Sequence, residues 1–96
     1  MLTPIILKNN DIPKFSKSVK FKFDVQRNKW IINAPERVIE LNESAAEILQ
    51  LINGKISIKT ITNKIKNKYV HTPEDLILND IIKLLQLLAD KRFVIK

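Results

Sequence analysis

The residues of this chain that could do acid–base, nucleophilic or metal chemistry are few and do not form a set. His71 is the only histidine and there is no cysteine, so neither a His cluster nor a thiolate zinc site can form. A serine nucleophile would need His71 as its base, and His71 stands in a polar segment between two predicted helices. The single glycine, Gly54, excludes glycine-rich phosphate loops. We therefore predict no catalytic residues, no metal, no cofactor and no enzyme activity.

The closest group of carboxylates consists of Glu40, Glu43 and Glu47. Their position at the start of a predicted helix favours a solvated or capping role, because acidic groups stabilise the positive end of the helix dipole. Residues 36–54 hold one Arg and four Glu, a net charge of −3, within a chain of net charge +7. The excess of lysine fits either a nucleic-acid-binding surface or an AT-rich coding sequence.

The first half of the chain is predicted to consist mainly of β-strands. Residues 19–25 alternate apolar and polar side chains, which is typical of a half-buried strand. A polar turn at 26–29 leads to a second strand from Trp30, and a turn at 33–36 leads to a third strand over residues 37–41. In a three-stranded meander this last strand is an edge, so one side of its backbone is unpaired.

Three helices are predicted after the third strand. The first runs over residues 43–52, with Asn42 as N-cap, and ends at Gly54. The second covers 58–69, and the third covers about 73–90. The order of elements predicts an α+β fold that is winged helix-turn-helix-like, with a three-stranded antiparallel sheet followed by three helices.

The chain has the length of a single domain. Residues 1–17 have no period and predict an extended N-terminal arm before a domain over 18–96. The apolar residues 5–7 fit packing on their own domain, which is the simpler reading, or on a second copy. The N-terminus lacks the basic start of a signal peptide, and no apolar run approaches the ~20 residues that span a bilayer. We predict a soluble cytoplasmic protein with no membrane partner.

The third helix has more apolar residues than the roughly three in seven that a helix covered on one side needs. Two neighbouring rows consist of Ile77, Ile81, Leu84 and Leu88 and of Leu78, Ile82, Leu85 and Ala89. Either a small core wraps closely around this helix, or one row lines a groove.

The segment from Ala34 to Leu49, which contains the run Leu41-Asn42-Glu43-Ser44-Ala45-Ala46, resembles the signature of the PqqD family. The likeness covers about residues 12–95, and it includes the Asn53-Gly54 pair. Arg92 departs from the family, whose tail often has glycine at this place, and Arg37 stands where some members have glycine. The resemblance implies a RiPP recognition element of pyrroloquinoline quinone or related biosynthesis. Such a domain is a peptide chaperone that binds the leader of a ribosomally made precursor and presents it to a modifying enzyme, often a radical SAM protein.

The resemblance also implies where the leader binds: as an added strand beside the third strand, in a cleft against the third helix. Strand addition gains affinity from backbone hydrogen bonds and specificity from apolar pockets. The expected peptide-binding residues are Arg37, Val38, Ile39, Glu40, Leu41, Leu78, Ile82 and Leu85. An equal alternative is that Ile81 and Leu84 face the peptide. The net positive charge favours an acidic leader.

Two other functions fit the sequence. A winged-helix DNA-binding protein would contact phosphates through lysines of the second helix, and its binding would be steeply salt-dependent. Those lysines are Lys59, Lys64, Lys66 and Lys68. Nucleic-acid binding is disfavoured because the third helix has few side chains that read base edges. The other alternative is a homodimer formed by pairing of edge strands.

Overall fold

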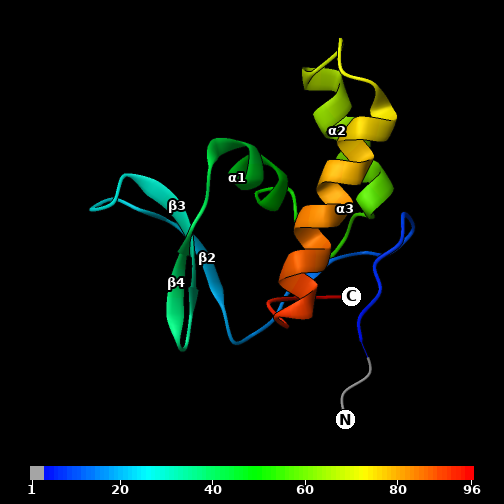
Figure 1. Cartoon of the computed structure of the whole chain (residues 1–96). Coiled ribbons are helices and arrows are strands. Elements are labelled where there is room, and N and C mark those ends of the chain that lie inside the picture. Colours follow the sequence, from blue (N-terminus) through cyan, green and yellow to red (C-terminus); the bar gives the residue numbers. More distant parts are fainter. Residues whose placement is uncertain (1–3) are drawn as a thin grey trace.

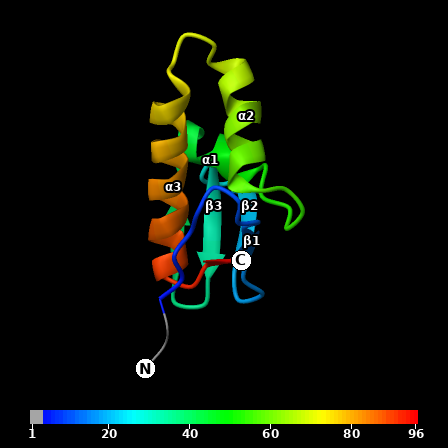
Figure 2. The same ribbon diagram turned by 90° about the vertical axis from the view of Figure 1, so that its right-hand side faces the viewer.

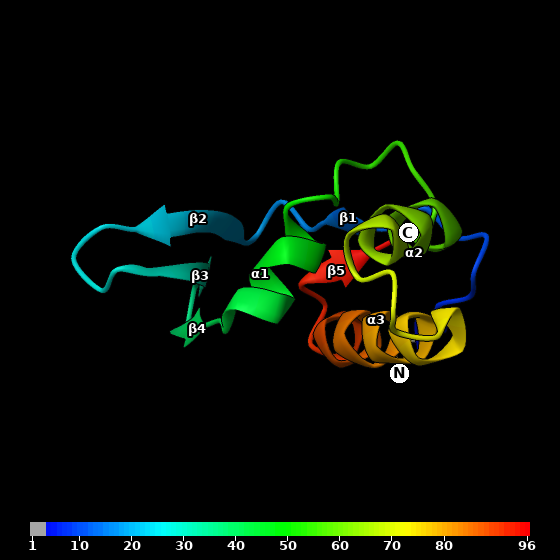
Figure 3. The same cartoon turned by 90° about the horizontal axis from the view of Figure 1, so that it is seen from above.

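The computed structural model describes residues 4–96 and shows a three-stranded sheet beside a pair of long helices (Figure 1). The elements in chain order are β1 (Lys14–Phe15), β2 (Lys20–Asp24), β3 (Lys29–Ala34), β4 (Arg37–Glu40), α1 (Glu43–Leu49), α2 (Ile58–Lys68), α3 (Glu74–Asp90) and β5 (Val94–Ile95). The main sheet has the order β2-β3-β4 and is antiparallel throughout. The predicted α+β, winged-helix-like fold class is confirmed. Seen from above, α1 lies between this sheet and the α2–α3 pair (Figure 3).

The β3–β4 hairpin is tighter than the sequence predicted. Asn33 and Ala34 pair with Val38 and Arg37, so the turn narrows to residues 35–36 and β3 extends two residues further at this end than predicted. Loops of two residues are among the commonest hairpin connections, and Pro35 suits the first loop position because its ring fixes φ near the value that a turn needs there.

Helix α1 ends three residues earlier than predicted, at Leu49. The Leu51 and Ile52 N–H groups donate to carbonyls only three residues back, at 3.1 and 3.2 Å, so the chain tightens after Leu49 in the manner of a 3₁₀ turn. Gly54 has φ +73° in the following loop and does not cap the helix. The N-cap prediction is confirmed, since Asn42 Oδ1 accepts from the Ala45 N–H at 2.8 Å.

The two long helices begin at different kinds of cap. In α2 the Ser57 hydroxyl oxygen accepts from the Thr60 N–H at 3.2 Å. In α3 Pro73 occupies the cap position with ψ 139°, so the helix starts at Glu74, one residue later than predicted. Figure 2 shows α2 and α3 side by side along their length.

The hydrophobic core lies where α1, α2, α3, β3 and β5 meet. Burial of a large aliphatic side chain contributes about 1.5–3 kcal/mol each, so this cluster carries much of the folding free energy. The largest fully buried side chains are Ile31, Ile32, Leu49, Ile58, Ile61, Ile81, Leu85, Val94 and Pro13.

The N-terminal arm (residues 4–17 of the described chain) lies against the helices and ends in a second, small sheet. In this two-stranded sheet β1 pairs antiparallel with β5. Leu7 is buried in the core of its own domain. Its N–H donates to Gln86 Oε1 at 3.0 Å, and Gln86 Nε2 donates to the Ile5 carbonyl oxygen at 2.6 Å. Residues 1–3 of the predicted arm lie outside the described residues.

Candidate functional site

Strand β4 is an outer strand of the main sheet, and no strand among residues 4–96 pairs with its second side. The Leu41 N–H donates to the Trp30 carbonyl oxygen of β3 at 3.0 Å. In an antiparallel ladder the N–H and C=O of one residue point to the same side, and the side alternates along the strand. Those of Ile39 therefore point to β3, whereas those of Val38 and Glu40 point to the open side. The Val38 side chain is 38% exposed.

The three α3 residues that the sequence predicts to bind the peptide face either the core or the N-terminal arm. Leu85 is fully buried in the core. Ile82 and Leu78 stand one and two turns before Gln86, which holds the N-terminal arm, so these two half-buried residues lie near that side. The structure therefore does not bring Leu78, Ile82 and Leu85 together with β4 as one surface.

A different row of α3 faces the direction of β4. Asp80, Leu84, Leu87 and Lys91 follow one another at helical spacing and form what we call the outer stripe. Asp80 lines a pocket together with Ser44 of α1, and Lys91 lines a pocket together with Arg37 of β4. The stripe thus runs from the start of α1 to the start of β4. The two residues of the alternative prediction, Ile81 and Leu84, differ in exposure. Ile81 is fully buried, whereas Leu84 lies half-buried on the outer stripe.

The pocket at the Asp80 end, the inter-helix pocket, has a volume of about 200 Å³. Its lining is Ser44, Glu47, Ile48, Ile65, Tyr69, Thr72, Ile77, Asp80 and Ile81. Glu47 accepts from the Tyr69 hydroxyl at 2.7 Å and from Lys68 Nζ at 3.0 Å. These hydrogen bonds, that of Tyr69 first, lower the pKa of Glu47 below its ordinary value, so it is a carboxylate at neutral pH. Asp80 forms no ion pair with another described side chain.

The pocket at the Lys91 end, the turn pocket, has a volume of about 280 Å³. Its lining is Ala34, Pro35, Glu36, Arg37, Lys91 and Phe93. Within the described chain, neither Arg37 nor Lys91 forms an ion pair. With two cations and one carboxylate, this end of the stripe has an excess of positive charge.

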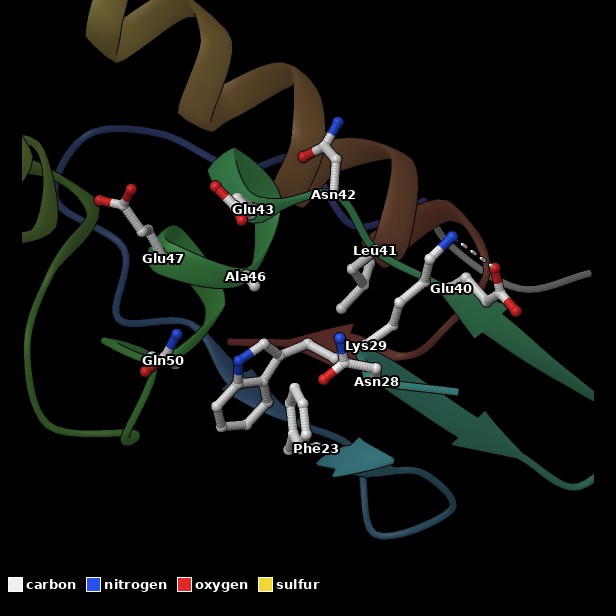
Figure 4. A pocket seen from close by; sticks show the side chains of 11 residues that line it. Phe23, Asn28, Lys29, Glu40, Leu41, Asn42, Glu43, Ala46, Glu47 and Gln50 are labelled. Atoms are coloured by element: carbon white, nitrogen blue, oxygen red, sulfur yellow. Dashed lines mark hydrogen bonds and ion pairs between the residues drawn. The ribbon is translucent and has the colours of Figure 1, made fainter. Parts of the chain in front are cut away.

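A wider hollow than these two pockets, of about 760 Å³, lies between the β2–β3 hairpin and α1 (Figure 4). Trp30 forms part of its floor, stacked on Phe21 with ring centroids 4.8 Å apart and edge-on to Phe23 at 5.6 Å. Glu40 at its border accepts from Lys29 Nζ at 3.2 Å. None of its lining residues comes from α3, so it is separate from the outer stripe. Of these three aromatic residues, Phe23 and Trp30 line the hollow, and Phe21 supports Trp30 from behind it.

Residues 4–96 contain neither a group of metal-ligating side chains nor a candidate membrane-spanning helix. No three side chains of the His, Asp and Glu types converge as a metal site would require. No helix of this part has the length and apolar character that crossing a bilayer needs.

The comparisons with known sequences give one consistent family. A family model described as coenzyme PQQ synthesis protein D (PqqD) matches residues 29–94. A protein of Bradyrhizobium diazoefficiens described as PqqA binding protein is 43% identical over 82 residues, which cover 85% of this chain and 79% of that protein. The bifunctional coenzyme PQQ synthesis protein C/D of Methylorubrum extorquens is 33% identical over 89 residues, which cover 93% of this chain and 24% of that longer protein.

A solved structure agrees with this result. The solution NMR structure of the PqqD truncation of Methylobacterium extorquens PqqCD represents, by its description, a functional and stand-alone RiPP recognition element. It matches this fold with a TM-score of 0.78 and 30% sequence identity, over 94% of this chain and 95% of that chain. With a family model across β3 to β5, a relative above 40% identity and a shared fold, this chain belongs to the PqqD family.

Proposed function

We propose that this chain is a non-catalytic peptide chaperone that binds the leader of a ribosomally synthesised precursor peptide by strand addition to β4. The observation that carries the proposal is the open side of β4, where the backbone groups of Val38 and Glu40 have no strand partner within the described residues. An unpaired edge beside apolar side chains is what strand addition requires. The name PqqA binding protein of the Bradyrhizobium relative supports a PqqA-type precursor as the ligand.

The proposed site combines the predicted β4 residues with the outer stripe of α3. Backbone pairing uses Val38 and Glu40, while Arg37, Ile39 and Leu41 complete the strand. From the helix we take Leu84, as in the alternative row, and add Leu87, because both have side-chain surface on the outer stripe. Leu85 is buried, and Leu78 and Ile82 lie near the arm, so the proposal gives them a role in the core rather than in peptide contact.

The bound leader is then presented to a modifying enzyme. The bifunctional C/D relative carries a region similar to this chain within a longer coenzyme PQQ synthesis protein, which supports an enzyme as the second partner. We propose a radical SAM enzyme for this chain, on the basis of the family resemblance. The role of the chain is to hold the peptide, which needs no catalytic group of its own.

The test is an NMR titration of the ¹⁵N-labelled chain with the precursor peptide encoded beside its gene. We expect chemical-shift changes that saturate and concentrate in residues 37–41 and at the outer-stripe residues Asp80, Leu84, Leu87 and Lys91. Residues of the arm side, Leu78 and Gln86, are expected to shift little. The proposal is wrong if residues 37–41 do not shift at tenfold peptide excess, or if a scrambled peptide produces the same changes.

A further inference from the structure

We infer that the open edge of β4 and the outer stripe of α3 together select a peptide with a charge pair: a Lys or Arg in the inter-helix pocket and, about five residues towards the C-terminus, an Asp or Glu at the turn pocket. This inference rests on the proposed function and states which peptides the same site takes. It goes beyond backbone pairing because it assigns two side-chain subsites, one at each end of the outer stripe.

The inter-helix pocket suits a long basic side chain. Four isoleucines form its apolar wall: Ile48, Ile65, Ile77 and Ile81. Its volume of about 200 Å³ exceeds the roughly 150 Å³ of an engineered cavity that holds benzene. Lys and Arg side chains bury their methylene stems on apolar surface and keep the charged group at the border. At that border Glu47 is already bonded by Tyr69 and Lys68, so Asp80 is the carboxylate left for an incoming cation.

The turn pocket suits an acidic side chain. Arg37 and Lys91 come to it from β4 and from the chain directly after α3, and Glu36 is the one carboxylate among its lining residues. An incoming Asp or Glu would meet two cations without an ion-pair partner in the described chain. The guanidinium of Arg37 can bind a carboxylate through two parallel hydrogen bonds.

The length of the stripe sets the spacing of the two charges. Asp80 and Lys91 are eleven residues apart in sequence, which corresponds to about 16 Å along a helix. An extended peptide advances about 3.3 Å per residue, so about five residues separate the two charged side chains. Leu84 and Leu87 lie between the two ends and would contact apolar residues of the peptide.

The order of the charges follows from the direction of β4. This strand runs from Arg37, at the turn pocket, towards α1, whose Ser44 lines the inter-helix pocket. The main sheet is antiparallel throughout, and antiparallel pairing is slightly more stable per residue than parallel pairing. An antiparallel peptide starts at the inter-helix pocket and ends at the turn pocket, which places the basic residue before the acidic one.

The experiment is a set of double-mutant cycles between the protein and a synthetic leader peptide with the sequence encoded beside the gene. Fluorescence anisotropy measures the affinity of wild type, Asp80→Asn and Arg37→Gln for the parent peptide and for peptides with single charged residues neutralised. We expect Asp80→Asn to weaken binding about three- to tenfold, and Arg37→Gln about two- to fivefold. Asp75→Asn and Lys83→Gln, exposed on the same helix, serve as controls and should change affinity less than twofold.

Each cycle has a defined result. Asp80 should couple to one basic residue of the peptide, and Arg37 to one acidic residue about five positions after it. The inference is overturned if the parent binds but Asp80 and Arg37 couple to no peptide charge, or if the coupled charges occur in the reverse order. If wild type does not bind the leader at all, the proposed function itself fails. NMR shifts in residues 37–41 distinguish these cases, because strand addition shifts them whether or not the charges couple.

Discussion

Gln86 Nε2 donates to the Ile5 carbonyl oxygen across 2.6 Å, and this bond decides which side of α3 is left for a partner. The N-terminal arm occupies the Gln86 side, and the core occupies the Leu85 side. The outer stripe, which contains Leu84 and Leu87, is the side that remains. A contact between residues 81 positions apart in sequence thus holds the arm over one side of α3 and leaves the outer stripe uncovered by it.

The first prediction concerns this contact. Gln86→Ala removes the hydrogen bonds to the Ile5 carbonyl and the Leu7 N–H, each worth about 0.5–1.5 kcal/mol. We expect the free energy of unfolding, measured with urea, to fall by about 1–3 kcal/mol. Peptide affinity should stay within twofold, because the arm and the outer stripe lie on different sides. Asn79→Ala, an exposed substitution on the same helix, is the control. Loss of peptide binding at unchanged stability would contradict this arrangement.

The second prediction uses proline substitutions to test the open side of β4 separately from the side that pairs with β3. The Val38 N–H points to the open side, and proline is tolerated on an edge strand where its missing N–H would face solvent. Val38→Pro should therefore keep the fold, as judged by the thermal unfolding temperature. It should reduce peptide affinity at least threefold, because it removes a peptide hydrogen bond worth about 0.5–1.5 kcal/mol and adds a ring at the contact.

Val38→Ala, which keeps the N–H group, is the matched control and should bind within twofold of wild type. Ile39→Pro removes an N–H that points to β3 and should destabilise the sheet itself. If Val38→Pro and Val38→Ala bind the peptide equally well, the backbone of β4 is not the docking edge.

The third prediction concerns hydrogen exchange along β4. Without peptide, the Val38 and Glu40 amides should exchange quickly, and those of Ile39 and Leu41 slowly, since only the latter two point to β3. Saturating leader peptide should slow exchange at Val38 and Glu40 by at least tenfold. NMR-detected exchange resolves the four amides individually. Equal protection of all four in the free protein would indicate that a second copy pairs with β4, which sedimentation would then detect.

The sequence predicts most of this fold because its main features are local. Period-two alternation marks β2, and capping residues Asn42 and Ser57 mark the starts of α1 and α2. The pairing of β1 with β5 was not predicted, because two residues are too few to show a period and the partners are far apart in the chain.

Only one part of the candidate site, the edge strand, can be predicted from the sequence. The edge strand follows from element order alone, since the last strand of a meander has one free side. The row of α3 that we propose faces the peptide does not follow from the sequence. It is neither of the two apolar rows, since it combines Leu84 and Leu87 with Asp80 and Lys91, and its exposure depends on where the arm and the core pack. The inter-helix pocket also needs three helices to come together, so no sequence pattern predicts that Asp80 and Ser44 line the same pocket.

The fourth prediction compares two equally exposed leucines of α3. Leu87 and Leu76 are both 55% exposed, but only Leu87 lies between Asp80 and Lys91 on the outer stripe. Leu87→Lys should weaken leader binding about three- to tenfold, by loss of apolar contact worth on the order of 1 kcal/mol. Leu76→Lys should leave affinity within twofold. Thermal unfolding of both variants should match wild type, and equal effects on binding would rule out the outer stripe as the contact surface.

The last prediction concerns acid stability and follows from Glu47. Hydrogen bonds from Tyr69 and Lys68 lower its pKa in the folded chain below the ordinary value of a glutamate. A carboxyl whose pKa is lower in the folded state contributes stability that is fully present above the unfolded pKa and is lost as pH falls through the folded pKa. The free energy of unfolding of wild type should thus decrease as pH falls below about 4.5. Glu47→Gln should flatten this decrease, whereas Glu36→Gln, at a carboxylate without an ion pair in the described chain, should keep it. Urea unfolding at pH 7, 5, 4 and 3 measures the difference, and parallel curves for wild type and Glu47→Gln would show that the Tyr69–Glu47–Lys68 contact does not stabilise the fold.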